Sequence, residues 1–307
     1  MKKTIIIFIV VIAIGAGAYF LILAPSRNVD VLTGQDVAGD TTNLQGNDQS
    51  GDTPVTEKDK AESVIGKSVE SRDITAYHFG DGNTEILFVG GIHGGYEWNT
   101  SLVAYEAIDY LRANPSIIPE NIKVTVIPVL NPDGLSKVIG ASTSRFSKAD
   151  VSTSQEVQIS GRFNGNEVDL NRNFDCDWQT NAKWQNKTVS GGKEVFSEPE
   201  ALAIKNYIEA KKPKAVVVWY SSAGGVFASS CHNGVLPETL TITNIYAKAS
   251  GYPAYENFDF YEITGDMVNW LAKEKIPAIS VLLTTHTDIE WTKNELGIKA
   301  LLDHYKQ

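Results

Sequence analysis

The sequence is short of cationic residues and of cysteines. Lysine and arginine together number 27 against 37 aspartate and glutamate residues, which gives a formal net charge of −10. Binding to nucleic acid needs clustered Lys and Arg to neutralise phosphates, and the sequence contains no such cluster. The composition therefore argues against a nucleic-acid-binding protein, whereas an acidic surface would keep an exported protein soluble.

Cys176 and Cys231 are the only cysteines in the 307 residues. In an exported chain an even number permits one disulfide, and we expect this pair to form it. Two buried free thiols are the alternative. No cysteine lies near the end of the N-terminal apolar run, so a lipid-modified anchor is not supported.

The N-terminus has the composition of a membrane segment. Lys2 and Lys3 precede residues 4–24, which carry no charge and are rich in Ile and Val. About 20 apolar residues cross a bilayer core. We therefore expect residues 1–24 to form a transmembrane anchor that places the rest of the chain outside the cytoplasm. Residues 16–18 offer a small-residue cleavage pattern, so a cleaved signal peptide and a secreted protein are the alternative.

Residues 25–60 contain no aromatic residue and are dominated by Asp, Gly, Asn, Gln and Thr. Such a segment buries too little apolar area to offset its loss of conformational entropy, so we expect a disordered polar linker. Residues 61–307 are long enough to bury one substantial core and are expected to form a single domain.

Apolar runs and helical periodicity predict that this domain is of the α/β class, with a mixed sheet flanked by helices. Two strands joined by a tight turn over 80–83 are expected first. Asn131-Pro132-Asp133-Gly134 is expected to be a turn that opens a long polar loop reaching Gly165, and Ser197 to cap a helix. The predicted strands are 74–79, 84–89, 122–129, 215–220 and 278–283, and the predicted helices are 100–113, 198–210, 238–250, 265–273 and 288–304.

A glycine-rich turn follows the predicted strand 84–89 and carries His93 and Glu97. Imidazole and carboxylate both suit Zn²⁺, and glycines let the backbone come close to a bound group. The pair alone is weak evidence for a metal site, because His and Glu often lie a few residues apart.

Further motifs follow in a fixed order. They are Asn131-Pro132-Asp133-Gly134, the run from Arg162 to Phe174 with Asp169-Leu170-Asn171-Arg172-Asn173-Phe174 at its end, Ser197-Glu198-Pro199-Glu200, and Tyr261 followed by Gly265 and Trp270. Together with the His-and-Glu turn, they make the chain resemble the zinc metallocarboxypeptidase family of carboxypeptidase A. The resemblance covers roughly residues 65–300.

In that family, the resemblance implies, His93 and Glu97 supply the first two zinc ligands. Three residues separate them here, where the family usually has two. The glycine pair Gly94-Gly95 can absorb the extra residue.

The resemblance also assigns residues that contact the peptide. Arg162 matches the arginine that polarises the scissile carbonyl group, a role that suits a permanent cation with several donors. Asn171 and Arg172 match the pair that grips the terminal carboxylate of the substrate. Tyr261 matches the mobile tyrosine that closes over the bound peptide. For the arginines a surface ion pair is the alternative interpretation, and for Tyr261 an interface aromatic.

Two positions depart from the family. Tyr220 stands where the third zinc ligand, a histidine, is expected, and a phenol with a pKa near ~10 is a poor ligand beside imidazole. Leu282 stands where the family has its general base, a glutamate, and leucine can neither accept nor return a proton. Zinc binding is therefore expected to be weakened or lost.

Other residues could compensate for these losses. His232 and His286 could approach the cleft, although a surface histidine is the simpler interpretation of His232. Asp266 lies where the family shapes its side-chain specificity pocket, but an acid at a helix N-terminus is the simpler interpretation.

We therefore expect an extracytoplasmic protein that recognises peptides with a free C-terminal carboxylate, for which cell-wall peptides are plausible, and that has lost hydrolysis. The alternative is an active zinc carboxypeptidase that releases C-terminal residues by metal-activated water. A structural wall-associated domain that neither binds nor cuts is a third interpretation.

Overall fold

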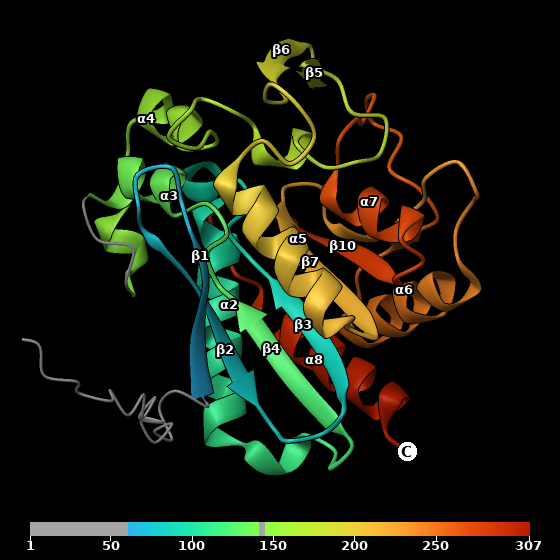
Figure 1. Ribbon diagram of the computed structural model, residues 1–307. Helices are drawn as coiled ribbons and strands as arrows, with labels where there is room; N and C mark the ends of the chain where they lie inside the picture. The colour runs from blue at the N-terminus through green and yellow to red at the C-terminus, as the bar shows by residue number, and fades with distance from the viewer. Residues whose placement is uncertain (1–60, 141–144) are drawn as a thin grey trace, which may run out of the picture. The chain divides into compact units, whose positions relative to one another are not determined.

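The computed structural model describes residues 61–140 and 145–307 (Figure 1). The expected membrane segment, residues 1–24, and the expected linker, residues 25–60, lie outside these ranges. Among the described residues, no helix combines the length and the hydropathy that a membrane span requires.

The described chain builds one large sheet and a small hairpin. The strands are β1 (Glu62–Lys67), β2 (Asp73–Phe79), β3 (Thr84–Val89), β4 (Ile122–Ile127), β5 (Asn181–Trp184), β6 (Lys187–Ser190), β7 (Ala215–Ser221), β8 (Gly225–Ala228), β9 (Ala254–Tyr255) and β10 (Ala278–Leu283). The large sheet has the order β1-β2-β4-β3-β7-β10-β8-β9, and β5 pairs with β6. Its centre, β4-β3-β7-β10, is parallel, while β2 and β8 join it antiparallel. The sheet is therefore mixed, as expected.

Helices cover both faces of this sheet. The α-helices are α2 (Trp98–Ala113), α3 (Pro132–Ile139), α4 (Gln155–Ser160), α5 (Pro199–Lys211), α6 (Pro237–Ser250), α7 (Met267–Lys273) and α8 (Trp291–Tyr305). Short 3-10 turns occur at η1 (Gly94–Glu97), η2 (Pro115–Ile117), η3 (Lys148–Asp150) and η4 (Leu170–Arg172). Figure 1 shows α5 and α7 on the near face of the sheet, and α2 and α8 behind it.

Burial explains why the central strands were recognisable. Every residue of β7 and of β10 is buried, which is typical of parallel strands covered on both faces. Alternate residues of a strand face opposite sides, so one apolar run supplies two separate core clusters. Such runs therefore predict the centre of the sheet well.

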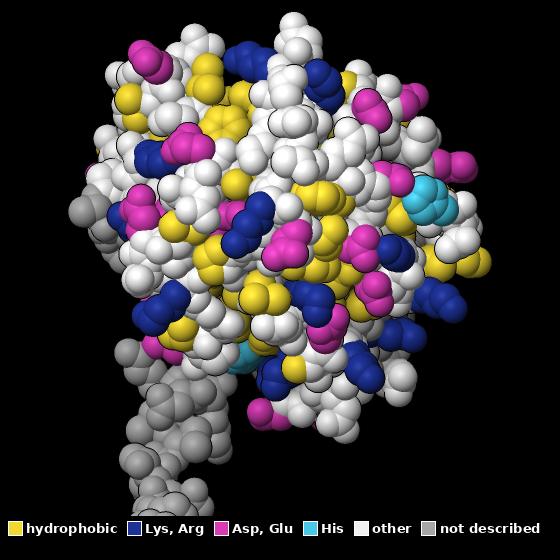
Figure 2. Space-filling model, turned by 45° about the horizontal axis from the view of Figure 1, so that its top comes forward, with side chains coloured by type: hydrophobic (Ala, Val, Ile, Leu, Met, Phe, Trp, Pro, Cys, Tyr) yellow, Lys and Arg dark blue, Asp and Glu magenta, His cyan; other side chains and the backbone are white. Residues whose placement is uncertain are grey.

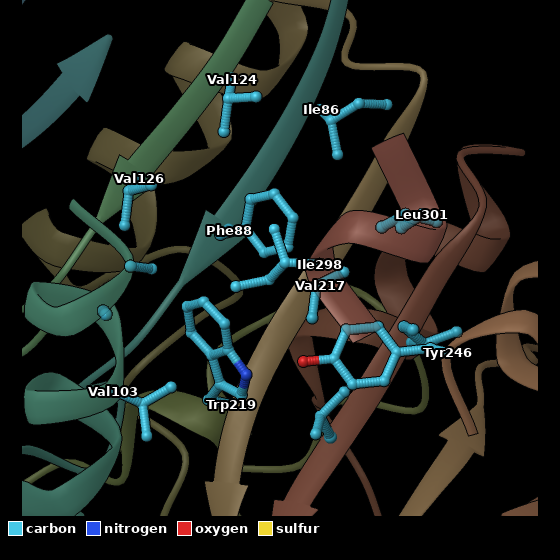
Figure 3. Packing of buried hydrophobic residues seen from close by; sticks show 14 of the residues in the cluster. Ile86, Phe88, Val103, Val124, Val126, Val217, Trp219, Tyr246, Ile298 and Leu301 are labelled. Atoms are coloured by element: carbon cyan, nitrogen blue, oxygen red, sulfur yellow. The ribbon is translucent and has the colours of Figure 1, made fainter. Parts of the chain in front are cut away.

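The core between the sheet, α2, α6 and α8 is aromatic at its middle (Figure 3). The rings of Phe88 and Trp219 stack with centroids 5.4 Å apart. Asn294 on α8 accepts hydrogen bonds at its Oδ1 from Trp219 Nε1 at 3.1 Å and from the Tyr246 hydroxyl at 2.9 Å. The polar atoms of both buried rings are therefore satisfied, as burial in an apolar core requires.

The structure corrects four local predictions. The strands joined by residues 80–83 do not pair with each other, because β2 and β3 each pair with β4. The expected loop after Asn131 begins with α3, whose first turn Asn131 caps by accepting a hydrogen bond from Gly134 N at 2.8 Å. The N-cap of α5 is Glu198 rather than Ser197. The last helix begins at Trp291, three residues later than expected.

The expected disulfide is present between Cys176 and Cys231. It joins the segment that follows η4 to the loop that follows β8, across a sequence separation of 55 residues.

Candidate functional site

A pocket of about 620 Å³ lies where β3, β7 and β10 end. Because these strands are parallel, their carboxyl ends meet at one edge of the sheet, which is where α/β proteins commonly bind ligands. All eight residues assigned from the sequence line it: His93, Glu97, Arg162, Asn171, Arg172, Tyr220, Tyr261 and Leu282. The structure thus brings together residues that span 190 positions, while their roles stay predictions.

His93 and Glu97 face each other at the inner wall of the pocket. His93 Nδ1 lies 2.9 Å from Glu97 Oε1, and both side chains are buried. The 3-10 turn η1 absorbs the extra residue between them. It needs glycine at Gly95, where a Cβ atom would overlap Val138, and at Gly94, whose φ is +45°. Burial alone would raise the pKa of Glu97, but neighbouring His93 and Arg162 lower it overall.

Asp169 lies behind the imidazole. Its Oδ1 is 3.5 Å from His93 Nε2, and its Oδ2 accepts a hydrogen bond from Arg162 Nε at 2.8 Å. The pKa of Asp169 is low despite its burial, because both arginines and His93 stabilise the carboxylate. A carboxylate behind one ring nitrogen is the arrangement that orients metal-binding histidines, and neither ring nitrogen of His93 has a hydrogen-bond partner among the described residues.

The position that the family resemblance assigns to the third zinc ligand holds a phenol that contacts other residues. Tyr220 packs its ring 5.6 Å from that of His93, and its hydroxyl lies 3.4 Å from Asn171 Oδ1. Burial raises the pKa of Tyr220 well above its usual range, which keeps the phenol protonated. Catalytic zinc sites have three protein ligands. These residues offer two, so they do not complete such a site.

Leu282 is directly beside Tyr220, since the register of β7 and β10 pairs the two residues. Its side chain is 7% exposed and lines the pocket, while the general-base role of this position stays a prediction from the family resemblance. No proton can be transferred at this position.

A second group of possible metal ligands lies outside this pocket. Within the described ranges, the ligand atoms of Cys176, Asp177, Cys231 and His232 lie within 4.8 Å of one another. The two sulfurs are joined in the disulfide, which leaves an exposed ion pair of His232 and Asp177 at 3.0 Å. His232 is therefore a surface residue, as expected, and does not replace the missing zinc ligand.

The pocket holds two buried guanidinium groups, Arg162 and Arg172, each 1% exposed. Arg162 Cζ lies 4.4 Å from the centre of the Trp184 ring. Arg172 donates from Nε to the carbonyl of Lys183 at 2.8 Å and from Nη1 to that of Asn171 at 2.5 Å. The Nη2 atoms of both arginines have no hydrogen-bond partner among the described residues.

Asp266 and Tyr261 line the pocket together with the two arginines. Asp266 caps α7 by accepting a hydrogen bond from Asn269 N at 3.0 Å, as the simpler interpretation predicts. It also accepts one from Asn171 Nδ2 at 2.8 Å, and burial raises its pKa. Tyr261 is half-buried, with its ring 5.2 Å from that of Phe258.

Sequence reasoning missed several residues of the pocket. Trp184 comes from the β5–β6 hairpin, which lies in a polar segment without a clear strand pattern. Ser221 is the last residue of β7, and Tyr96 lies in η1. Both line the pocket, but neither was assigned a role from the sequence. His286 was considered as a residue that could approach the cleft, and it lines the pocket.

Comparison with known proteins agrees with this geometry. The model of the zinc carboxypeptidase family matches residues 57–288. Human carboxypeptidase D is 32% identical over 126 residues, which are 36% of this chain and 8% of that protein. The human carboxypeptidase N catalytic chain is 26% identical over 185 residues, which are 56% of this chain and 37% of that one. The chain thus matches a minor part of these curated relatives.

Two solved structures share the fold. Murein-tripeptide amidase MpaA from Escherichia coli O157 aligns with a TM-score of 0.56 and 20% identity, over 80% of this chain and 93% of that one. Bovine thrombin-activatable fibrinolysis inhibitor, in complex with tick carboxypeptidase inhibitor, aligns with a TM-score of 0.60 and 16% identity, over 79% and 89%. With the family match covering most of the chain, this protein belongs to the zinc carboxypeptidase family.

Proposed function

We propose that this protein binds peptides through their free C-terminal carboxylate and does not hydrolyse them. The observation that carries the proposal is the pair of buried guanidinium groups whose Nη2 atoms lack partners in the pocket. A buried donor left unsatisfied costs about 1–3 kcal/mol, and more when it is charged. A carboxylate ligand would satisfy Arg172 directly, and a carbonyl oxygen of the same ligand would satisfy Arg162.

The neighbouring residues support the same ligand. Asn171 is held by Asp266 and by Met267 N, which donates to Asn171 Oδ1 at 3.0 Å. The amide is therefore fixed beside Arg172 before any ligand arrives. A preorganised donor set loses little entropy on binding, which favours affinity.

The absence of hydrolysis is inferred from Tyr220 and Leu282. A water molecule that attacks a peptide carbonyl must lose a proton, and the leaving amine must gain one. Leu282 can do neither. Because Tyr220 replaces a histidine, only His93 and Glu97 would remain as ligands of a metal. Loss of general acid–base assistance alone costs about 10² to 10⁴ in rate.

The proposal includes a location outside the cytoplasm. It rests on Lys2 and Lys3 before the apolar residues 4–24, whether these serve as an anchor or as a cleaved signal. Because the similar structure MpaA is a murein-tripeptide amidase, cell-wall peptides are the first ligands to test.

Arg172→Ala provides the decisive test. We expect residues 61–307 to bind a cell-wall tripeptide with a free C-terminus and to bind its C-terminal amide at least tenfold more weakly. In the variant, the acid and the amide should bind with equal affinity. Isothermal titration calorimetry measures all four affinities, those of acid and amide for the wild-type protein and for the variant. Arg112→Ala is the matched control, because it removes an arginine that is 58% exposed at its side chain and lies on α2. Equal affinity of the wild-type protein for acid and amide would contradict the proposal.

A second function, zinc-dependent hydrolysis, is favoured by one observation. His93 Nδ1 and Glu97 Oε1 converge at 2.9 Å with Asp169 behind the imidazole, as two ligands of a metal would. Bound zinc would supply a Lewis acid and an activated water.

The double variant Tyr220→His, Leu282→Glu separates the two functions. We expect it to gain stoichiometric zinc and measurable carboxypeptidase activity, since it restores a third ligand and a proton acceptor. The unaltered protein should lack activity in the same assay after zinc is added. Zinc at one equivalent together with turnover in the unaltered protein would replace the binding function with the hydrolytic one.

A further inference from the structure

Three polar side chains from separate elements meet at the edge of the pocket. Ser221, at the end of β7, has its Oγ 2.8 Å from His286 Nδ1 and 3.2 Å from Asn99 Oδ1. Asn99 lies in the first turn of α2, and His286 lies in the turn that follows β10. None of the three belongs to the motifs of the family resemblance.

The orientation of the Asn99 amide is fixed by its other hydrogen bonds. Its Nδ2 donates to the carbonyl oxygens of Thr285 at 2.8 Å and of Asp288 at 2.9 Å. The flipped amide would place its oxygen against these two carbonyl oxygens and leave all three without a donor. Asn99 is completely buried, so water cannot relieve that conflict. Its Oδ1 therefore faces Ser221 and can only accept.

This orientation determines where the protons of the other two residues lie. The Ser221 hydroxyl has one proton, and it donates that proton to Asn99 Oδ1. A lone pair of Oγ then remains to accept a hydrogen bond from His286 Nδ1–H. In this tautomer Nε2 carries a bare lone pair. Burial lowers the pKa of His286, which keeps the ring neutral at physiological pH.

The same arrangement argues against Ser221 as a nucleophile. A serine nucleophile must give its proton to the neighbouring imidazole, which requires Nδ1 to be an acceptor. Here the serine proton points to Asn99, and Nδ1 is the donor. The three residues therefore orient the ring rather than activate the hydroxyl.

The oriented ring belongs to the ligand pocket. His286 lines the same cavity as Arg162 and Arg172, and its ring lies 4.8 Å from that of Tyr96. No hydrogen bond to Nε2 occurs within residues 61–140 and 145–307. The arginines donate to carboxylate and carbonyl oxygens, so the ligand's own donors, its N–H groups, need an acceptor elsewhere in the pocket.

We infer that His286 Nε2 accepts a hydrogen bond from a peptide N–H of the bound ligand, with Asn99 and Ser221 as positioning residues. This inference rests on the proposed binding of peptides with a free C-terminus. It adds that the protein distinguishes an amide linkage from an ester of the same shape.

Two-dimensional ¹H–¹⁵N NMR of the histidine ring nitrogens tests the tautomer without any ligand. We expect the neutral Nδ1–H form for His286 in the wild-type protein. Ser221→Ala removes the acceptor for this proton and should shift the ring toward the Nε2–H form. Finding the Nε2–H form in the wild-type protein would overturn the inference.

Binding of N-acetyl-trialanine and of three analogues, each with one of its three backbone N–H groups replaced by an ester oxygen, tests the contact. One analogue should bind the wild-type protein about 5- to 10-fold more weakly, as expected for one hydrogen bond. His286→Asn keeps a donor near the Nδ1 position but has no acceptor at that of Nε2, so it should bind amide and ester equally.

The outcomes separate this inference from the proposed function. An unchanged amide-to-ester ratio in His286→Asn overturns the role of Nε2 while leaving carboxylate binding intact. If no free-acid probe binds any variant, the proposed function fails, and the contact with Nε2 fails with it.

Discussion

Glu200 is a completely buried carboxyl group in the first turn of α5. Its Oε1 accepts a hydrogen bond from Val69 N at 3.1 Å, and its Oε2 accepts one from Asn164 Nδ2 at 3.1 Å. Burial outweighs these contacts and raises its pKa to about 7. Asn164 lies between Arg162 and Asp169 in the sequence, so this carboxyl group contacts the segment that carries both of these residues.

The raised pKa predicts how stability depends on pH. An unfolded glutamate has a pKa of about 4.3, so between that pH and about 7 the folded state binds more protons than the unfolded state. The free energy of unfolding should therefore fall as the pH rises through this window, by at most about 4 kcal/mol from this group. Glu200→Gln should flatten the decrease, measured by urea unfolding at pH 5, 6, 7 and 8. An identical slope in the variant would show that Glu200 is not the titrating group.

Single residues also mark the limit of what the sequence could predict at the site. The family resemblance located Arg162, Arg172 and Tyr261, because their motifs are local in the sequence. The contact of Ser221 with His286 and Asn99 depends on three elements meeting in space, and no spacing in the sequence encodes it. Sequence reasoning could name His286 as a candidate, but not its partners.

Helices and strands could be predicted where the sequence pattern favoured a single type of secondary structure. β10 was predicted with its exact bounds because burial on both faces makes it a continuous apolar run. α3 was missed because Asn131-Pro132 fits both a turn and a helix start, as Asn is a good N-cap and Pro suits the first helical position. β8 and β9 are too short to show a period, with four and two residues.

The connection between η4 and α7 depends on a glycine. Gly265 has φ +63°, and an added Cβ atom would overlap the carbonyl group of Arg172. Its carbonyl accepts a hydrogen bond from Phe174 N at 3.0 Å, and its own N donates to the carbonyl of Cys176 at 2.7 Å. The backbone of Arg172, for which we propose carboxylate binding, is thus in direct contact with this glycine.

Gly265→Ala should therefore weaken peptide binding as well as stability, because the methyl group must displace Arg172. Gly251→Ala is the matched control. Gly251 also has a positive φ, +76°, but nothing lies within 4 Å of an added Cβ atom. It should cost about 1–2 kcal/mol of stability from backbone strain alone and leave the affinity unchanged. Titration calorimetry and urea unfolding of both variants decide this, and equal affinities would show that Gly265 does not position Arg172.

At the scale of the whole molecule, the parallel strands explain why one pocket collects residues from distant parts of the sequence. β3, β7 and β10 deliver His93, Tyr220 and Leu282 to the same edge. Arg162 and Tyr261, which lie outside the helices and strands, line the same pocket. On the face shown in Figure 2, Lys and Arg side chains alternate with Asp and Glu, with hydrophobic side chains between them.

The disulfide links two segments that are 55 residues apart in the sequence, and its removal should lower the stability of the whole domain. Cys176 and Cys231 close a loop of 55 residues, for which the chain-entropy relation gives a stabilisation of about 4 kcal/mol. Cys176→Ser with Cys231→Ser should lower the free energy of unfolding by roughly this amount, measured by urea denaturation. A reductant should lower the stability of the wild-type protein similarly but leave that of the double variant unchanged. The backbone carbonyl of Cys176 also accepts the hydrogen bond from Gly265 N, so a less restrained segment in the variant should weaken peptide binding. Stability equal to that of the oxidised wild-type protein would mean that packing alone holds this segment in place.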